Sequence, residues 1–191
     1  MSEFLLTLNT STIMKAPLMQ KIRVAAEAGF GGIELWNDDL TAYVESGGSL
    51  KDVKAALDDA GLVVPTVIHI GGWLDSEGEA YQAALDVAKR KMEQAAAVGA
   101  PRIIAGPPPG PVDLDRAAER YRELLAIGRS TGVLPAMEFL GFVNGVHTIR
   151  AAWEIVTRAG DPDGTIVLDP FHIFRGGSPI EDIALIPGER I

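Results

Sequence analysis

Short apolar runs and longer stretches with helical spacing alternate along the chain. The apolar runs are bounded by Gly, Pro, Asn or Ser, which is typical of strands between turns, and the stretches between them repeat apolar residues every three to four positions, which is typical of helices. The expected strands are residues 4–8, 31–36, 63–70, 101–105, 134–139 and 165–168. The expected helices are residues 17–29, 50–60 and 77–98, one from a cap at Asp113 or Asp115 to Gly132, residues 146–159, and a short one after Pro179.

This alternation predicts one α/β domain. The expected strands are apolar on both faces, as in a parallel sheet covered by helices, and no linker divides residues 1–191. Six βα units in series fit either a doubly wound sheet or a (β/α)8 barrel, which typically needs ~250 residues. Residues 186–191 look like a loop that enters a seventh strand. The barrel hypothesis therefore carries the expectation that C-terminal sequence is missing, or that a partner covers the open edge.

Composition narrows the classes of function. Of the 191 residues, 47% are hydrophobic and 23% are charged, which is ordinary for a globular protein. No apolar run reaches the ~20 residues that span a bilayer, and the N-terminus lacks a basic segment followed by an apolar one, so we expect no membrane partner and no export. The absence of cysteine fits the cytoplasm. The net charge of −9 disfavours a nucleic-acid partner and leaves a small-molecule pocket and a homo-oligomer open.

An acid lies at the C-terminal end of two of the expected strands, within one residue of the end. Glu138 lies near the end of the fifth, and Asp169 follows the sixth, about one strand–helix repeat later. Neighbouring parallel strands lie about 4.8 Å apart, so these carboxylates would repel each other unless a positive charge lies between them. A divalent metal is the usual answer, and His172 follows on the same rim. The structural alternatives are a buried acid paired with a base for Glu138, a turn cap before Pro170 for Asp169, and a packed or surface ring for His172.

Motifs at four places carry a resemblance to a known family. They are residues 28–35 (Ala-Gly-Phe-Gly-Gly-Ile-Glu-Leu), 137–139 (Met-Glu-Phe), 168–172 (Leu-Asp-Pro-Phe-His) and 173–177 (Ile-Phe-Arg-Gly-Gly). In this order they resemble the xylose isomerase-like superfamily of TIM barrels, the sugar phosphate isomerase/epimerase group, over essentially the whole chain. The resemblance implies a (β/α)8 TIM-barrel fold, of which about six βα units are present here.

The same resemblance implies one divalent metal ion. Its four ligands are a Glu after strand five, an Asp after strand six, a His after strand seven and a Glu after strand eight. Glu138 and Asp169 match the first two, and this chain offers no residues that match the last two. Oxygen ligands with one imidazole suit Mg, Mn, Co or Zn.

Further candidates for substrate contact lie at the ends of the strands, where a barrel carries its site. His69 and Glu34 end the third and second strands and would point toward the mouth. Trp36 and Trp73 could wall a sugar-sized pocket, although packing in the core explains them equally well. Arg175 could bind a carboxylate or phosphate through two hydrogen bonds, or be a solvated loop charge.

The resemblance implies a metal-dependent isomerase or epimerase that acts on a small sugar or keto-polyol through an enediolate. The ion would chelate a carbonyl and the adjacent hydroxyl, Glu138 would take or return the proton, and His172 would contact a substrate oxygen. The alternative on the same scaffold is a lyase that dehydrates a cyclic keto-polyol such as inosose or 3-dehydroshikimate, with His172 protonating the departing hydroxyl. Arg175 would favour this alternative if it binds a substrate carboxylate.

Two further hypotheses belong to other classes. Cleavage of abasic DNA, as by endonuclease IV, needs a cluster of three zinc ions and more histidines than the three in this chain, His69, His147 and His172. The acidic composition also opposes it. The other hypothesis is a truncated barrel that only binds or assembles.

Overall fold

The computed structural model describes residues 4–191 and contains one six-stranded sheet in the order β1-β2-β3-β4-β5-β6. Every neighbouring pair is parallel. Because neighbours in the sheet are also neighbours along the chain, each connection repeats the same crossover, as in a (β/α) barrel. The expected fold class is confirmed as a TIM-barrel-like half-barrel of six βα units. The strands are β1 (Thr7–Asn9), β2 (Gly32–Trp36), β3 (Thr66–Ile70), β4 (Arg102–Ala105), β5 (Leu134–Glu138) and β6 (Thr165–Val167).

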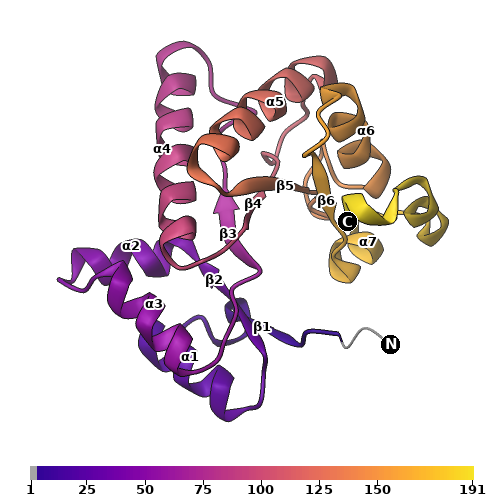
Figure 1. Ribbon diagram of the computed structural model, residues 1–191. Coiled ribbons are helices and arrows are strands. Elements are labelled where there is room, and N and C mark those ends of the chain that lie inside the picture. Colours follow the sequence, from indigo (N-terminus) through magenta and orange to yellow (C-terminus); the bar gives the residue numbers. More distant parts are fainter. Residues whose placement is uncertain (1–3) are drawn as a thin grey trace.

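Helices connect the strands, and α3 to α6 run along one side of the sheet (Figure 1). Local sequence explains where several of them begin: Ser49 forms a capping box with Asp52, and the side chains of Asp113 and Thr148 cap α5 and α6. The α-helices are α1 (Leu18–Glu27), α2 (Asn37–Glu45), α3 (Leu50–Asp59), α4 (Gly78–Ala97), α5 (Leu114–Thr131), α6 (Ile149–Ala159) and α7 (Pro170–Gly176). Short 3-10 helices are η1 (Thr10–Ile13), η2 (Ile180–Leu185) and η3 (Gly188–Arg190). In residues 4–191, no helix is both long and apolar enough to cross a membrane.

The main core lies between the sheet and its helices. Side chains on alternate strand positions point to opposite faces, and one face supplies fully buried apolar residues, among them Ile33, Val67, Ile103 and Met137. The residues that follow these four lie on the opposite face and line a cavity: Glu34, Ile68, Ile104 and Glu138. The sheet therefore separates an apolar layer from a face that carries acids.

The sequence pattern misplaces the first strand. We expected residues 4–8, whereas β1 covers Thr7–Asn9. Phe4 is 94% exposed, and the pairing with β2 starts only at Thr7, opposite Gly32. Among residues 4–6, only the carbonyl of Leu6 bonds to this neighbour, accepting from the N–H groups of Gly31 and Gly32, so the paired strand begins at Thr7.

Three other expectations need correction. The segments that form α2 and α7 were not predicted as helices. Residues 186–191 form no strand: they contain η3, and Arg190 donates hydrogen bonds to the carbonyls of Gly164 and Asp161. The third strand is shorter than expected, because Pro65 lacks an N–H and leaves Val63 only an isolated bridge to Gly32.

Candidate functional site

A cavity of about 310 Å³ lies at the C-terminal ends of the strands. Asn9 and Glu138 are the last residues of β1 and β5, and Asp169 follows β6, so polar side chains from separated strands converge on one rim. This is the end of the barrel at which TIM-barrel enzymes carry their sites. The lining residues are Asn9, Glu34, Ile68, Ile104, Glu138, Val167, Leu168, Asp169 and Pro170.

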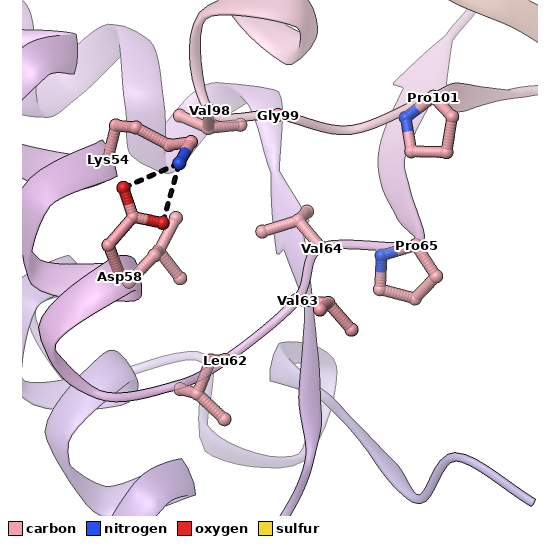
Figure 2. A pocket seen from close by; sticks show the side chains of 10 residues that line it. Lys54, Asp58, Leu62, Val63, Val64, Pro65, Val98, Gly99 and Pro101 are labelled. Atoms are coloured by element: carbon pink, nitrogen blue, oxygen red, sulfur yellow. Dashed lines mark hydrogen bonds and ion pairs between the residues drawn. The ribbon is translucent and has the colours of Figure 1, made fainter.

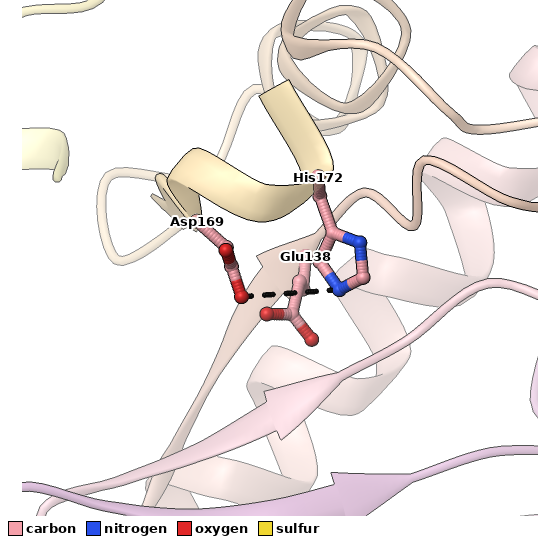
Figure 3. A group of neighbouring side chains, drawn as sticks. All are labelled: Glu138, Asp169 and His172. Atoms are coloured by element: carbon pink, nitrogen blue, oxygen red, sulfur yellow. Dashed lines mark ion pairs between the residues drawn. The ribbon is translucent and has the colours of Figure 1, made fainter. Parts of the chain in front are cut away.

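Glu138, Asp169 and His172 form a compact group on this rim (Figure 3). Each offers one possible ligand atom, and the three atoms all lie within 4.8 Å of one another. Glu138 pairs with Val167 in the sheet, so Asp169, two residues further along, projects from the same face. The structure thus brings together the three residues that the sequence singles out first.

Asp169 also fixes the start of α7. Its carboxylate accepts a hydrogen bond from the backbone N–H of Phe171 at 2.7 Å, and Pro170 occupies the first turn, where a missing N–H costs nothing. The cap begins a helix immediately after the strand. His172 is therefore turned back over the rim, with its Nε2 3.9 Å from Asp169 Oδ2.

The electrostatics of the group favour a bound cation. Burial raises the pKa of Glu138 to about 8, and the charges of Asp169 and Glu34 add to the rise. Within residues 4–191, Glu138 and Asp169 together make one ion pair, that between Asp169 and His172. Two hard oxygen donors that repel each other, with no Lys or Arg paired to them among the described residues, form a donor set suited to a divalent metal.

His172 is nearly buried, with 8% of its surface exposed. Its Nδ1 accepts a hydrogen bond from the backbone N–H of Gly141 at 3.2 Å. The rings of Phe142 and Phe171 meet it edge-on, with centroids 5.4 and 5.1 Å away. Burial lowers the pKa of His172, and the charge of Asp169 opposes this. The ring is thus held from three sides, with Nε2 on the side of the acids.

Glu34 joins the rim from β2. Its carboxylate accepts hydrogen bonds from Asn9 Nδ2 at 2.7 Å and from the hydroxyl of Thr66. Burial raises the pKa of Glu34, the hydrogen bond from Thr66 opposes the rise, and the charge of Asp169 adds to it. Asn9 lines the cavity and was missed by the sequence prediction. The one feature of the sequence that could have indicated Asn9 is its position, since it is a polar residue directly after the first apolar run.

His69 and Trp36 lie beside each other at the ends of β3 and β2. Their rings meet edge-on at 5.7 Å, and Trp36 Nε1 donates to Ser11 Oγ at 3.0 Å. Burial lowers the pKa of His69, the charge of Lys91 adds to this, and Asp38 opposes it. Neither residue lines the cavity that holds Glu34, Glu138 and Asp169, so their roles as substrate contacts stay predictions.

Trp73 and Arg175 lie apart from the cavity lining. Trp73 is fully buried, donates its Nε1 hydrogen bond to the carbonyl of Gly106 at 2.9 Å and packs against Tyr121. A ligand at the rim does not reach such a side chain, so the expected substrate contact of Trp73 is corrected to core packing. Arg175 is exposed in the last turn of α7.

A second cavity, of about 350 Å³, lies at the opposite ends of the strands, between α3 and the segments that enter β3 and β4 (Figure 2). Its lining is mostly aliphatic and includes the exposed ion pair of Lys54 with Asp58, 2.6 Å apart. Features at this end of a TIM barrel usually serve stability. The acidic rim is therefore the better candidate site.

Comparison with known proteins supports the barrel fold described above. A family model described as a xylose isomerase-like TIM barrel matches residues 22–191. A 3-dehydroshikimate dehydratase of Pseudomonas aeruginosa is 28% identical over an alignment of 186 residues that covers 93% of this chain and 28% of that enzyme. An inosose isomerase of Bacillus velezensis is 36% identical over 76 residues, 39% of this chain and 27% of that enzyme. The chain thus spans less than a third of the length of the dehydratase that it matches.

Solved structures repeat the fold. The IOLI protein, whose crystal structure contains a zinc atom, superposes with a TM-score of 0.90 at 23% identity, covering 98% of this chain and 70% of that one. At this identity the likeness shows the fold alone, and the zinc is a property of that protein.

Proposed function

Because the chain belongs to the xylose isomerase-like TIM barrel family, we propose that its acidic rim removes and returns a proton next to the carbonyl of a small sugar or keto-polyol, with a divalent ion bound. The observation that carries the proposal is the group of Glu138, Asp169 and His172, whose possible ligand atoms all lie within 4.8 Å of one another. Carboxylates and imidazoles are the side chains that most often transfer protons in enzymes. Similar curated proteins are enzymes that act on compounds of this kind.

Glu138 and Asp169 would hold the ion. Their oxygen donors suit Mg, Mn, Co or Zn, and no Lys or Arg among the described residues pairs with them, which leaves their charge for a cation to neutralise. Such an ion would supply Lewis acidity, which polarises a carbonyl and acidifies the adjacent C–H.

The chain's own side chains would divide the remaining work. Glu138 would accept the proton on one face of the substrate and return it. His172 would hydrogen-bond to a substrate oxygen beside the acids, and Glu34 with Asn9 would bind hydroxyl groups at the opposite rim of the cavity. Burial of Glu138 and His172 would keep water away from the transferred proton.

Isomerisation or epimerisation is the outcome that we propose first. Isomerisation needs only these groups, because Glu138 can return the proton to the neighbouring carbon on the same face, whereas epimerisation needs a second acid–base group on the opposite face. Dehydration of a cyclic keto-polyol is the second candidate. The specific observation in its favour is the dehydratase that matches 93% of the chain. Both outcomes start with the same proton removal.

The first test is metal binding by the purified 191-residue chain. After removal of bound metal, the parent should take up one Mn²⁺ or Zn²⁺ in a calorimetric titration. Glu138→Gln and Asp169→Asn should each weaken binding at least tenfold, because each removes one charged ligand. Glu45→Gln, which changes an exposed acid at the end of α2, is the matched control. Equal binding by all four proteins would refute the proposed site.

A second test separates the two outcomes. The metal-loaded chain is incubated with keto-polyols, including inosose and 3-dehydroshikimate, and followed by ultraviolet absorbance and by NMR. Interconversion of isomers without a new absorbance band supports the first candidate. A rising band of a conjugated enone supports dehydration. Glu138→Gln should abolish whichever activity is found.

A further inference from the structure

Two glycines let the β5–α6 loop and α7 touch through their backbones. A Cβ on Gly176 would lie 1.9 Å from the carbonyl oxygen of His147 and 3.1 Å from Gly141 Cα. A Cβ on Gly141 would lie 2.6 Å from Gly176 N and 2.7 Å from the carbonyl oxygen of His172. Real Cβ atoms do not approach backbone atoms so closely. The place where the β5–α6 loop crosses α7 at Gly141 and Gly176, here called the crossing, therefore requires glycine at both positions.

The crossing places a particular donor against His172. Because Gly141 lies directly on α7, its backbone N–H points at Nδ1 of the imidazole, 3.2 Å away. A neutral imidazole has one nitrogen that donates and one that accepts, and the partner of one nitrogen fixes the state of the other. Since Nδ1 accepts, Nε2 must carry the proton.

The protonated nitrogen is the one that faces the acids. Nε2 lies 3.9 Å from Asp169 Oδ2, and the edge-on rings of Phe142 and Phe171 pack on the imidazole. A half-turn of the ring would place a C–H against the N–H of Gly141 and leave that donor unpaired. His172 therefore offers a proton to the rim, whereas a metal ligand must offer a lone pair.

We propose that Gly141 and Gly176 are positioning residues that hold His172 in its Nε2–H tautomer, so that the nitrogen that faces the acids carries a proton. The substrate oxygen that would accept this proton in a hydrogen bond belongs to the function proposed above. Only the identity of the acceptor rests on the proposed function. The tautomer itself follows from the contacts of the metal-free chain and is tested separately.

The test is two-bond ¹H–¹⁵N NMR of the metal-free chain at an alkaline pH, where the imidazoles are neutral. The chain has three histidines, and His172→Gln assigns the signal. We expect Nδ1 of His172 to resonate as an unprotonated nitrogen and Nε2 as a protonated one. The opposite pattern, or an even mixture of the two tautomers, would overturn the proposal in the parent protein.

Gly176→Ala tests the crossing. It should shift the two nitrogens of His172 toward the averaged values of a free imidazole. The matched control is Gly110→Ala, since a Cβ there meets nothing within 4 Å, and its His172 signals should match those of the parent. A folded Gly176→Ala variant with the parent's tautomer would refute the positioning role, and if this variant does not fold, the spectrum of the parent decides.

Zinc separates this proposal from the proposed function. On saturation with Zn²⁺, Nε2 of His172 should keep its proton, whereas coordination through Nε2 would remove it and move the proton to Nδ1. If the chain takes up no zinc, the proposed function fails, while the tautomer measured without metal still stands or falls on its own.

Discussion

The surroundings of Glu138 determine whether its carboxyl group is charged. Glu138 ends a strand whose preceding residues are buried, so its carboxyl group faces the rim with little water around it. Nearby are Asp169 and Glu34, both acids. Water would favour the charged form of Glu138, and burial with like charges disfavours it. The residue is thus held ready either to bind a cation or to exchange a proton.

This environment predicts how stability depends on pH in the metal-free chain. On folding, the pKa of Glu138 rises from 4.5 to about 8. Between these values the folded protein holds a proton that the unfolded chain has lost, so its contribution to the free energy of unfolding falls as pH rises through this range. Glu138→Gln cannot ionise. At alkaline pH this variant should be more stable than the parent by on the order of 2 kcal/mol.

Urea unfolding in a chelator at a series of pH values measures this difference. The two proteins should differ least at the acid end of the range, where Glu138 is protonated in both folded and unfolded chains. Glu189→Gln, at an exposed position, should follow the parent throughout. Stability curves of Glu138→Gln and the parent that run parallel at all pH values would contradict the raised pKa.

At the scale of elements, α1 and α2 are joined by a buried ion pair. Lys21 Nζ lies 2.6 Å from Asp39 Oδ2, and the lysine side chain is 0% exposed whereas that of the aspartate is 24% exposed. Removing one partner of a buried pair leaves the other charge without compensation. The loss should therefore depend on which partner is removed.

We expect Asp39→Asn to cost about 3 kcal/mol of unfolding free energy, because it strands a fully buried ammonium group. Lys21→Met should cost less, since it leaves a carboxylate that water still reaches. Lys54→Met breaks a pair that is 40% and 61% exposed and should change stability by less than about 1 kcal/mol. Denaturant unfolding at neutral pH ranks the three variants, and equal losses for both partners of the buried pair would show that exposure does not set the cost.

For the whole molecule, the repeat in the sequence predicted parallel strands joined by helices, but it fitted both a doubly wound sheet and a barrel. The family resemblance favoured the barrel, and the sequential strand order of the structure agrees with it. The pair Glu138 and Asp169 was predictable from the repeat, since both end buried runs one repeat apart. The α7 helix was not predicted, because the weak turn signal of Asp169-Pro170 masks its role as a helix cap. Trp73 could not be placed, because only the fold brings Gly106 and Tyr121 against it.

The strands that carry the rim residues pack in one hydrophobic core that includes residues from α1 to α6. A ligand that binds only the folded state raises the free energy of unfolding by RT ln(1 + [L]/Kd), which is about 2.7 kcal/mol at one hundred times Kd. For a chain of this size, that gain corresponds to a rise of about 5–10 °C in the melting temperature. We expect Zn²⁺ or Mn²⁺ at this excess to produce such a rise in the parent and a clearly smaller one in Asp169→Asn. Calorimetric melting with Glu45→Gln as the control measures it. A rise of the same size in Asp169→Asn would place the bound metal somewhere other than the acidic rim.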